Sequence, residues 1–170
     1  MSTRVKADKV YLVGFMGAGK TTVARALARR LDWEAVDIDE LIEQRERLSV
    51  SEIFVKHGEP YFRMVERAVL ADQLAPRHRV VATGGGTFVE PQNRAAINGD
   101  GVSVWLDVPL DRVIARLPPD NRRPLAADRV EFERLFHARR EAYQHAHIRL
   151  DASRASVDAL VEELVDWLDS

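Results

Sequence analysis

The sequence predicts an α/β protein built on a mainly parallel sheet. Short apolar runs alternate along the chain with longer segments whose apolar residues recur every three or four positions. The 170 residues fit one ordinary domain, and no repeat or low-complexity linker divides them. We therefore expect a single domain over residues 1–170, with helices between successive strands.

Five short apolar runs are the predicted strands, because runs of this length between helical segments are typical of a buried sheet. In chain order they are Lys9–Val13, Ala35–Ile38, Val80–Thr83, Val102–Leu106 and Ile148–Leu150.

The helices are predicted from periodicity and from their end signals. The segment Thr21–Leu31 carries apolar residues four positions apart, which gives it one buried face. Ser49–Glu52 has the pattern of a capping box and predicts a helix that ends before Gly58. Pro60 suits the first turn of the next helix, which runs to about Leu74, because proline has no N–H group to leave unpaired there. The remaining predicted helices are Pro91–Asn98, Leu110–Leu117, Asp128–His147 and Ala155–Leu168.

Composition narrows the class of protein. The chain has no cysteine, which excludes disulfides and thiolate metal sites and suits the cytoplasm. The net charge of −2 argues against nucleic acid as a partner. The apolar stretch Val10–Ala18 is shorter than a membrane span, and no secretory signal is visible, so we expect no membrane partner. Since no lysine follows Lys56, an anion bound by the later part of the chain must be bound by arginine.

The segment Gly14–Thr21 matches the phosphate-binding loop (P-loop) pattern G-x-x-x-x-G-K-[ST], between a predicted strand and a predicted helix. Its glycines let backbone N–H groups point at phosphate oxygens, and the start of the helix adds its dipole. Lys20 is expected to reach the β- and γ-phosphates, and the Thr21 hydroxyl is a ligand for Mg²⁺. No Asn-Lys-x-Asp guanine signature is present, and the chain is short for a motor domain. The sequence thus favours a small kinase.

Two carboxylates end the second predicted strand. Asp37 and Asp39, two positions apart on an extended chain, would point into one crevice at the carboxyl end of the sheet, where ligands of α/β proteins bind. One would help to hold Mg²⁺ through water, and the other would accept the proton of the acceptor hydroxyl. The alternative is that Asp39 caps the next helix.

Three further features have both a functional and a purely structural interpretation. Gly84–Gly86 ends the third strand, where glycines permit close approach to the backbone, or form a plain loop. Arg63 and Glu66, three positions apart on a helix, would simply pair with each other. Arg139 and Arg140, taken alone, would be solvated, and the segment 117–127 is a cationic, proline-rich loop.

Seven segments, spread over nearly the whole chain, together resemble a known protein family. They are Gly14–Thr21, Asp37-x-Asp39, Ser49–Phe54 with Gly58-Glu59, Phe62-Arg63-x-x-Glu66, Gly84–Gly86, Arg123-Pro124-Leu125 and Arg139 to Tyr143. In this order and spacing they resemble the shikimate kinase family. The resemblance implies a three-layer P-loop kinase fold with a five-stranded parallel sheet, a mobile substrate-binding segment at about 39–67 and a lid at about 117–127. It also implies a monomer.

The activity implied by the resemblance is ATP-dependent phosphorylation of the 3-hydroxyl of shikimate, on the route to chorismate and the aromatic amino acids. By position, the resemblance implies that the catalytic residues are Lys20, Asp39 and Arg123, and that the residues binding shikimate are Asp39, Arg63, Gly85, Gly86 and Arg139. It implies that the nucleotide is bound by Gly17, Ala18, Gly19, Lys20, Thr21, Thr22, Arg116, Arg123 and Arg154, and that Mg²⁺ is held by Thr21 and Asp37.

Three departures from the family pattern stand at Ile38, Ala126 and Glu141. The departure at Glu141 leaves the alignment of this helix with the family pattern open, so Arg140 remains an alternative to Arg139. Two other functions stay open at this point. One is a kinase of another small hydroxylated metabolite, such as gluconate, and the other is a non-catalytic module that only binds nucleotide.

Overall fold

The computed structural model describes residues 8–116 and 129–170, and its centre is a sheet of five strands in the order β2-β3-β1-β4-β5. The strands are β1 (Lys9–Val13), β2 (Glu34–Asp37), β3 (Arg79–Ala82), β4 (Val102–Asp107) and β5 (Ile148–Asp151). All four neighbouring pairs are parallel. Every residue of β1 and β4 is buried, as expected for strands covered on both faces. The predicted α/β class and parallel sheet are confirmed.

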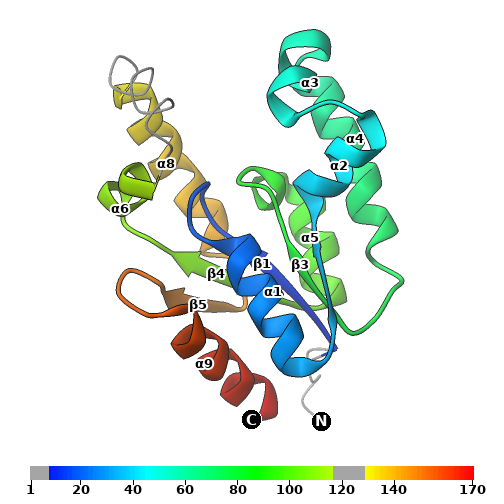
Figure 1. Cartoon of the computed structure of the whole chain (residues 1–170). Helices are drawn as coiled ribbons and strands as arrows, with labels where there is room; N and C mark the ends of the chain where they lie inside the picture. Colours follow the sequence, from blue (N-terminus) through cyan, green and yellow to red (C-terminus); the bar gives the residue numbers. More distant parts are fainter. Residues whose placement is uncertain (1–7, 117–128) are drawn as a thin grey trace.

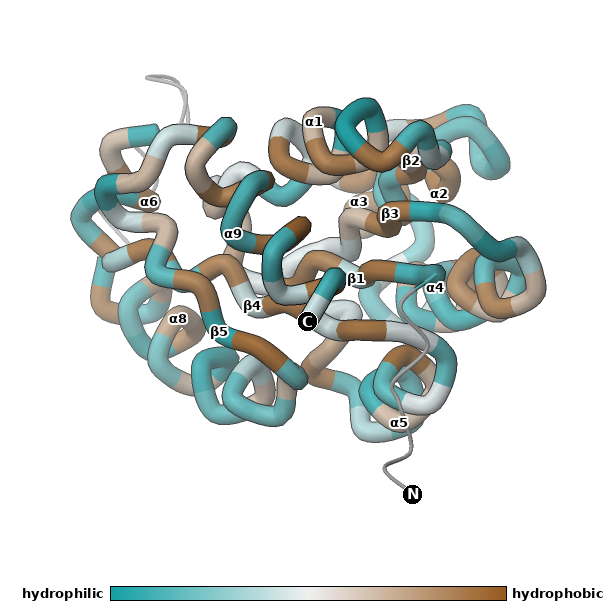
Figure 2. The backbone as a smooth tube through the Cα atoms, turned by 90° about the horizontal axis from the view of Figure 1, so that it is seen from below, coloured by the Kyte–Doolittle hydropathy of each residue, from teal (hydrophilic) through white to brown (hydrophobic). Residues whose placement is uncertain are grey.

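Helices cover both faces of the sheet. Helices α1 (Lys20–Leu31) and α9 (Val157–Asp169) lie side by side on one face, and α5 (Pro91–Asp100) lies on the other (Figures 1 and 2). Helix α8 (Arg129–Tyr143) shares the face of α5. In β4 the Ser103 hydroxyl donates to Asn98 of α5, and the next side chain on that face, Trp105, packs on Tyr143 of α8. The result is the three-layer P-loop kinase fold.

The chain after β2 differs from the prediction. We expected the strand to continue through Ile38, but β2 ends at Asp37 and a helix that the sequence analysis missed, α2 (Ile38–Glu46), begins at once. The cause is local, because Asp37 Oδ1 accepts a hydrogen bond from the Glu40 N–H at 3.1 Å and so caps the helix. Asp39 therefore lies in the first turn of α2 and does not cap it, and the prediction that it extends the strand was wrong.

The next helices follow their predicted signals. The capping box forms at the start of α3 (Val50–His57), where the Ser49 hydroxyl accepts from the Glu52 N–H at 3.1 Å. Helix α4 (Glu59–Asp72) has Pro60 in its first turn, as predicted. Helices α2 and α3 extend beyond the carboxyl ends of the strands (Figure 1).

Elsewhere the structure adds one short helix and ends another earlier than predicted. A short 3₁₀ helix, η1 (Thr87–Val89), follows the glycines after β3 and was not predicted. Helix α6 (Leu110–Arg116) matches its prediction, whereas α8 ends at Tyr143 and not at His147. The predicted lid at 117–127, with Arg123, lies outside the described residues. In the part of the chain that the structure covers, no helix is long and apolar enough to cross a membrane.

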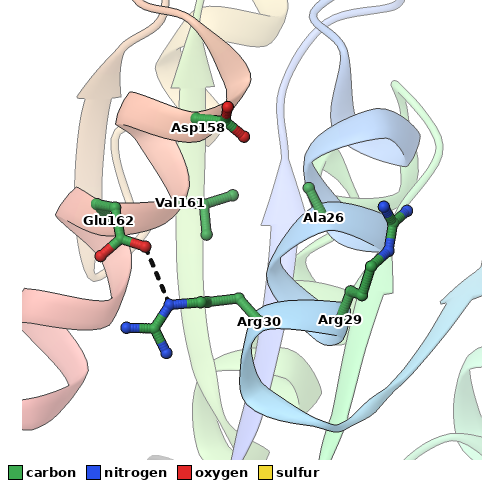
Figure 3. A pocket seen from close by; sticks show the side chains of 6 residues that line it. All are labelled: Ala26, Arg29, Arg30, Asp158, Val161 and Glu162. Carbon is green, nitrogen blue, oxygen red and sulfur yellow. Dashed lines mark hydrogen bonds and ion pairs between the residues drawn. The ribbon is translucent and has the colours of Figure 1, made fainter.

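A polar network at the amino ends of the strands centres on Asp100. Its carboxylate accepts from the Tyr11 hydroxyl at 2.6 Å and from Arg77 Nη1 at 2.5 Å. Lys9 Nζ lies 3.2 Å from the same carboxylate, and the Lys9 side chain is 0% exposed. By contrast, Arg30 and Glu162, which join α1 to α9, form an ion pair of 3.0 Å in which both side chains are at least half exposed (Figure 3).

We predict that Asp100→Asn lowers the free energy of unfolding by about 3 kcal/mol, because it leaves buried Lys9 without its charged partner. The matched control, Glu162→Gln, removes an exposed ion pair and should change stability little. Urea denaturation monitored by circular dichroism measures both. Equal effects of the two variants would contradict the prediction.

Candidate active site

The P-loop joins β1 to α1 at the carboxyl edge of the sheet. Gly17 and Gly19 have φ angles of 76° and 91°, a backbone conformation that glycine adopts without strain. Gly19 is also the N-cap of α1, and neither a capping side chain nor an acidic residue occupies the first turn of the helix. The N–H groups of that turn are therefore available to an anion.

Lys20 is buried inside this loop. Its Nζ donates to the carbonyl oxygens of Gly14 at 2.6 Å and of Phe15 at 3.1 Å. Burial lowers the pKa of Lys20 to about 8, and the nearby carboxylates Asp39 and Asp37 oppose that shift. A bound phosphate would place a negative charge next to the Lys20 ammonium group.

Thr21 and Asp37 provide a pair of oxygen atoms beside the loop. The Thr21 hydroxyl donates to Asp37 Oδ2, while Asp37 Oδ1 caps α2. Among the residues described, no group of three or more His, Cys, Asp or Glu side chains could hold a metal without other ligands. A hydroxyl and a carboxylate beside a phosphate site nevertheless fit a hard cation that keeps several waters and phosphate oxygens as ligands.

Asp39 lies near the P-loop. Burial raises the pKa of its carboxyl to about 6, and the nearby Asp37 carboxylate adds to the shift while Lys20 opposes it. Asp39 and Lys20 both line a hollow together with the P-loop and with Thr83–Gly85. The Asp39 carboxylate thus titrates closer to neutral pH than an ordinary aspartate does.

The three glycines after β3 make room for three charged side chains. A Cβ atom on Gly84 would lie 2.8 Å from Asp39 Oδ1, one on Gly85 would lie 3.0 Å from Arg139 Nη1, and one on Gly86 would lie 2.5 Å from Arg63 Nη2. None of the three glycines has a positive φ, so space rather than conformation requires them. The interpretation that they permit close approach is confirmed.

Arg63, on α4, makes the ion pair that the sequence suggested. Its Nη1 donates to Glu66 at 2.9 and 3.1 Å, and the Glu66 side chain is only 1% exposed. The guanidinium also faces Gly86 and packs against the Phe62 ring, with Cζ 5.2 Å from its centroid. Pairing with Glu66 therefore orients Arg63 toward the glycine turn, so the structural and functional interpretations are compatible.

The structure distinguishes Arg139 from Arg140. Arg140 donates to the buried carboxylate of Asp107 at 2.6 Å and stacks 4.8 Å from the centre of the Trp105 ring. Arg139 instead faces Gly85 and has no ion pair with any described carboxylate. Burial lowers the pKa of Arg139, and the nearby Arg63 adds to that effect. Arg139 is thus the better placed of the two to bind a substrate carboxylate.

A second hollow lies beside the P-loop and includes several of the residues predicted to bind the nucleotide. Its lining residues are Ala18, Gly19, Thr22, Val23, Arg116, Ala152, Ala155, Val157 and Leu160. Arg116 Nη1 donates to the carbonyls of Gly17 at 3.2 Å and Ala18 at 3.3 Å, so it lies over the loop. Arg154 is exposed between two of the lining alanines, and its nucleotide-binding role stays a prediction.

Fold and site together define a P-loop kinase. The shikimate kinase family model matches residues 16–169. A shikimate kinase of Sulfurihydrogenibium sp. is 41% identical over 92% of this chain and 95% of its own length. A shikimate kinase of Acinetobacter baumannii, solved in complex with shikimate, is 33% identical with a TM-score of 0.88 and covers 95% of this chain and 92% of its own. The enzyme of Aquifex aeolicus is 33% identical with a TM-score of 0.81, over 95% and 96% of the two chains.

The chain belongs to the shikimate kinase family. It is an ATP-dependent phosphotransferase with an alcohol acceptor, which confirms the resemblance that the motifs carried.

Two residues that contact the glycine turn, Thr87 and Tyr143, were assigned no role from the sequence. The Thr87 hydroxyl accepts from the Gly84 N–H at 2.9 Å, and the Tyr143 hydroxyl donates to the Gly85 carbonyl. The four-residue spacing of Arg139 and Tyr143 placed those two on one helix face, but no local pattern indicated the contact of Thr87 with Glu66, 21 positions away.

We predict that Gly86→Ala raises the KM for shikimate roughly tenfold to a hundredfold, the range of a lost charged hydrogen bond, because the new methyl group displaces Arg63. Gly99→Ala is the matched control, since a Cβ there meets nothing within 4 Å. Steady-state kinetics with shikimate varied at saturating ATP measures both variants. An unchanged KM in Gly86→Ala would refute the steric role of this glycine.

Proposed function

We propose that this chain transfers the γ-phosphoryl group of ATP to the 3-hydroxyl of shikimate, giving shikimate 3-phosphate and ADP on the route to chorismate. The observation that carries the proposal is the convergence of Arg63, Arg139 and Asp39 on one glycine turn beside the P-loop. The bound shikimate named for the Acinetobacter baumannii relative supports the choice of acceptor.

Arg63 and Arg139 hold the carboxylate of shikimate in this proposal. A planar guanidinium binds a carboxylate through two parallel hydrogen bonds, which a lysine cannot do. The two guanidiniums come from different helices and face adjacent glycines, so a small carboxylate between them would contact both. Its negative charge would also offset the repulsion between the two arginines.

Asp39 accepts the proton of the 3-hydroxyl as the hydroxyl oxygen attacks the γ-phosphorus. The bond between that phosphorus and the bridging oxygen of ATP breaks, and ADP leaves. Burial and nearby charges shift the pKa of Asp39, and no described residue donates a hydrogen bond to its carboxylate, so its oxygens are free to take the proton. The carboxylate is ionised above its pKa of about 6 and is therefore a competent base near neutral pH.

The nucleotide is bound by the P-loop and by the hollow next to it. Lys20 and the N–H groups of Gly17 and Gly19 face the phosphates, with Arg116 over the loop. Thr21 and Asp37 would hold Mg²⁺, which would supply positive charge beside the phosphates of ATP. By family resemblance, Arg123 and the segment at about 117–127 would close over the transferred group, and residues at about 39–67 would form the substrate-binding segment.

Two alternative functions have less support. Membership of the shikimate kinase family does not favour gluconate as acceptor. A non-catalytic module that only binds nucleotide would not need to retain Lys20 and both aspartates, all of which lie in the site.

We predict ADP release that depends on shikimate. A coupled assay with ATP and Mg²⁺ compares shikimate, gluconate and no acceptor. Release with shikimate alone is the expected result, because only this acceptor combines a ring hydroxyl with a carboxylate for both arginines. Release with gluconate alone would reject the acceptor, and ATP binding without any acceptor-dependent release would favour the non-catalytic module.

We also predict that kcat/KM falls below pH 6, because protonated Asp39 cannot accept a proton. The pKa of Asp39 is raised to about 6, so activity is present above that pH and lost as the pH falls through it. Asp39→Asn should retain ATP binding and lose about 10²- to 10⁴-fold in kcat, together with the acidic limb of the pH profile. Near-normal turnover, or the same acidic limb in the variant, would remove Asp39 from the proton transfer.

A further inference from the structure

Two hydroxyl groups from different elements hold the glycine turn. On one side, Thr87 Oγ1 accepts from the Gly84 N–H at 2.9 Å and donates to Glu66 Oε2 at 2.9 Å. On the other side, the Tyr143 hydroxyl donates to the carbonyl oxygen of Gly85. Gly85 is thus bonded directly to α8, which carries Arg139, and Gly84 is linked through Thr87 to Glu66 of α4, which carries Arg63.

The Thr87 side forms a fixed chain of hydrogen bonds. Both Thr87 and Glu66 are fully buried, at 0% exposure. The Thr87 carbonyl accepts from Asn93 Nδ2 at 3.1 Å, which restrains its backbone as well. Because Glu66 also binds Arg63 at 2.9 Å, the position of that guanidinium is tied through Thr87 to the position of Gly84.

On the other side, Tyr143 links the glycine turn to α8, the helix that carries Arg139. Tyr143 is 1% exposed, and its ring lies 6.0 Å from that of Trp105. Burial raises the pKa of Tyr143, so its hydroxyl stays a donor to Gly85 at every physiological pH. Arg139 lies four residues earlier on α8, on the same face of the helix, and faces Gly85 itself.

We propose that Thr87 and Tyr143 are positioning residues, which hold the glycine turn so that Arg63 and Arg139 reach the same substrate carboxylate. This inference rests on the proposed function. Like charges repel, and Arg139 forms no ion pair with a described carboxylate, so the two half-buried guanidiniums need a fixed backbone beside them to stay directed at one point. The two hydroxyls supply that restraint without contacting the substrate.

The test measures recognition of the carboxylate and not activity alone. The wild type is first assayed with shikimate and with the analogue whose carboxylate is replaced by a carboxamide. Absence of turnover with shikimate at this stage would reject the proposed function itself. The ratio of kcat/KM for the two acceptors then reports how well the arginines select a charged group.

Thr87→Val removes the hydroxyl and keeps the shape, and Thr87→Ser keeps the hydroxyl. We expect Thr87→Val to raise the KM for shikimate roughly tenfold and to lower the carboxylate preference by a similar factor, with the KM for ATP nearly unchanged. Thr87→Ser should retain most of that preference. Tyr143→Phe, which removes only the hydroxyl, should lower the preference in the same way and serves as a second test if Thr87→Val does not fold.

An outcome in which either folded variant loses turnover equally with both acceptors would show a general structural role and overturn the proposal. So would an unchanged carboxylate preference in Tyr143→Phe.

Discussion

The active site depends on three consecutive residues that have no side chain. At Gly84, Gly85 and Gly86 the backbone comes so close to a carboxylate and two guanidiniums that a Cβ atom would lie 2.5–3.0 Å from each of them. Burial disfavours the charged forms of these groups. It raises the pKa of Asp39 and lowers the pKa of Arg139, and it is the largest cause of both shifts. In the proposed function, the carboxylate of the acceptor would place a negative charge beside Arg63 and Arg139 and offset the repulsion between them.

The strand order brings donor and acceptor together. Because β3 lies between β1 and β2, the glycine turn at its end is next to the P-loop on one side and to the aspartates on the other. Parallel strands place all three of these segments at one edge of the sheet. The two arginines proposed to bind the acceptor come from α4 and α8. Glu66, through Thr87, and Tyr143 connect these helices to the turn. Phosphoryl transfer needs positioning and charge neutralisation above all, and this arrangement supplies both.

Much of this could be predicted from local sequence patterns. Alternating apolar runs predicted the sheet, and the P-loop pattern predicted the phosphate site, because each is encoded within a few neighbouring residues. Helix α2 was missed because the strand was expected to continue past Asp37, whereas Asp37 is both the last residue of β2 and the N-cap of α2. The contact between Thr87 and Glu66 could not be predicted, since it depends on how α4 packs against the end of β3. The choice between Arg139 and Arg140 likewise required Asp107, which is 33 positions from Arg140 along the chain.

The most direct test of this account is a crystal structure of the protein with shikimate and ADP. The account predicts that the shikimate carboxylate lies between Arg63 and Arg139, against Gly85 and Gly86, with the 3-hydroxyl within hydrogen-bond distance of Asp39. A carboxylate bound away from both arginines, or a 3-hydroxyl directed away from Asp39, would contradict it.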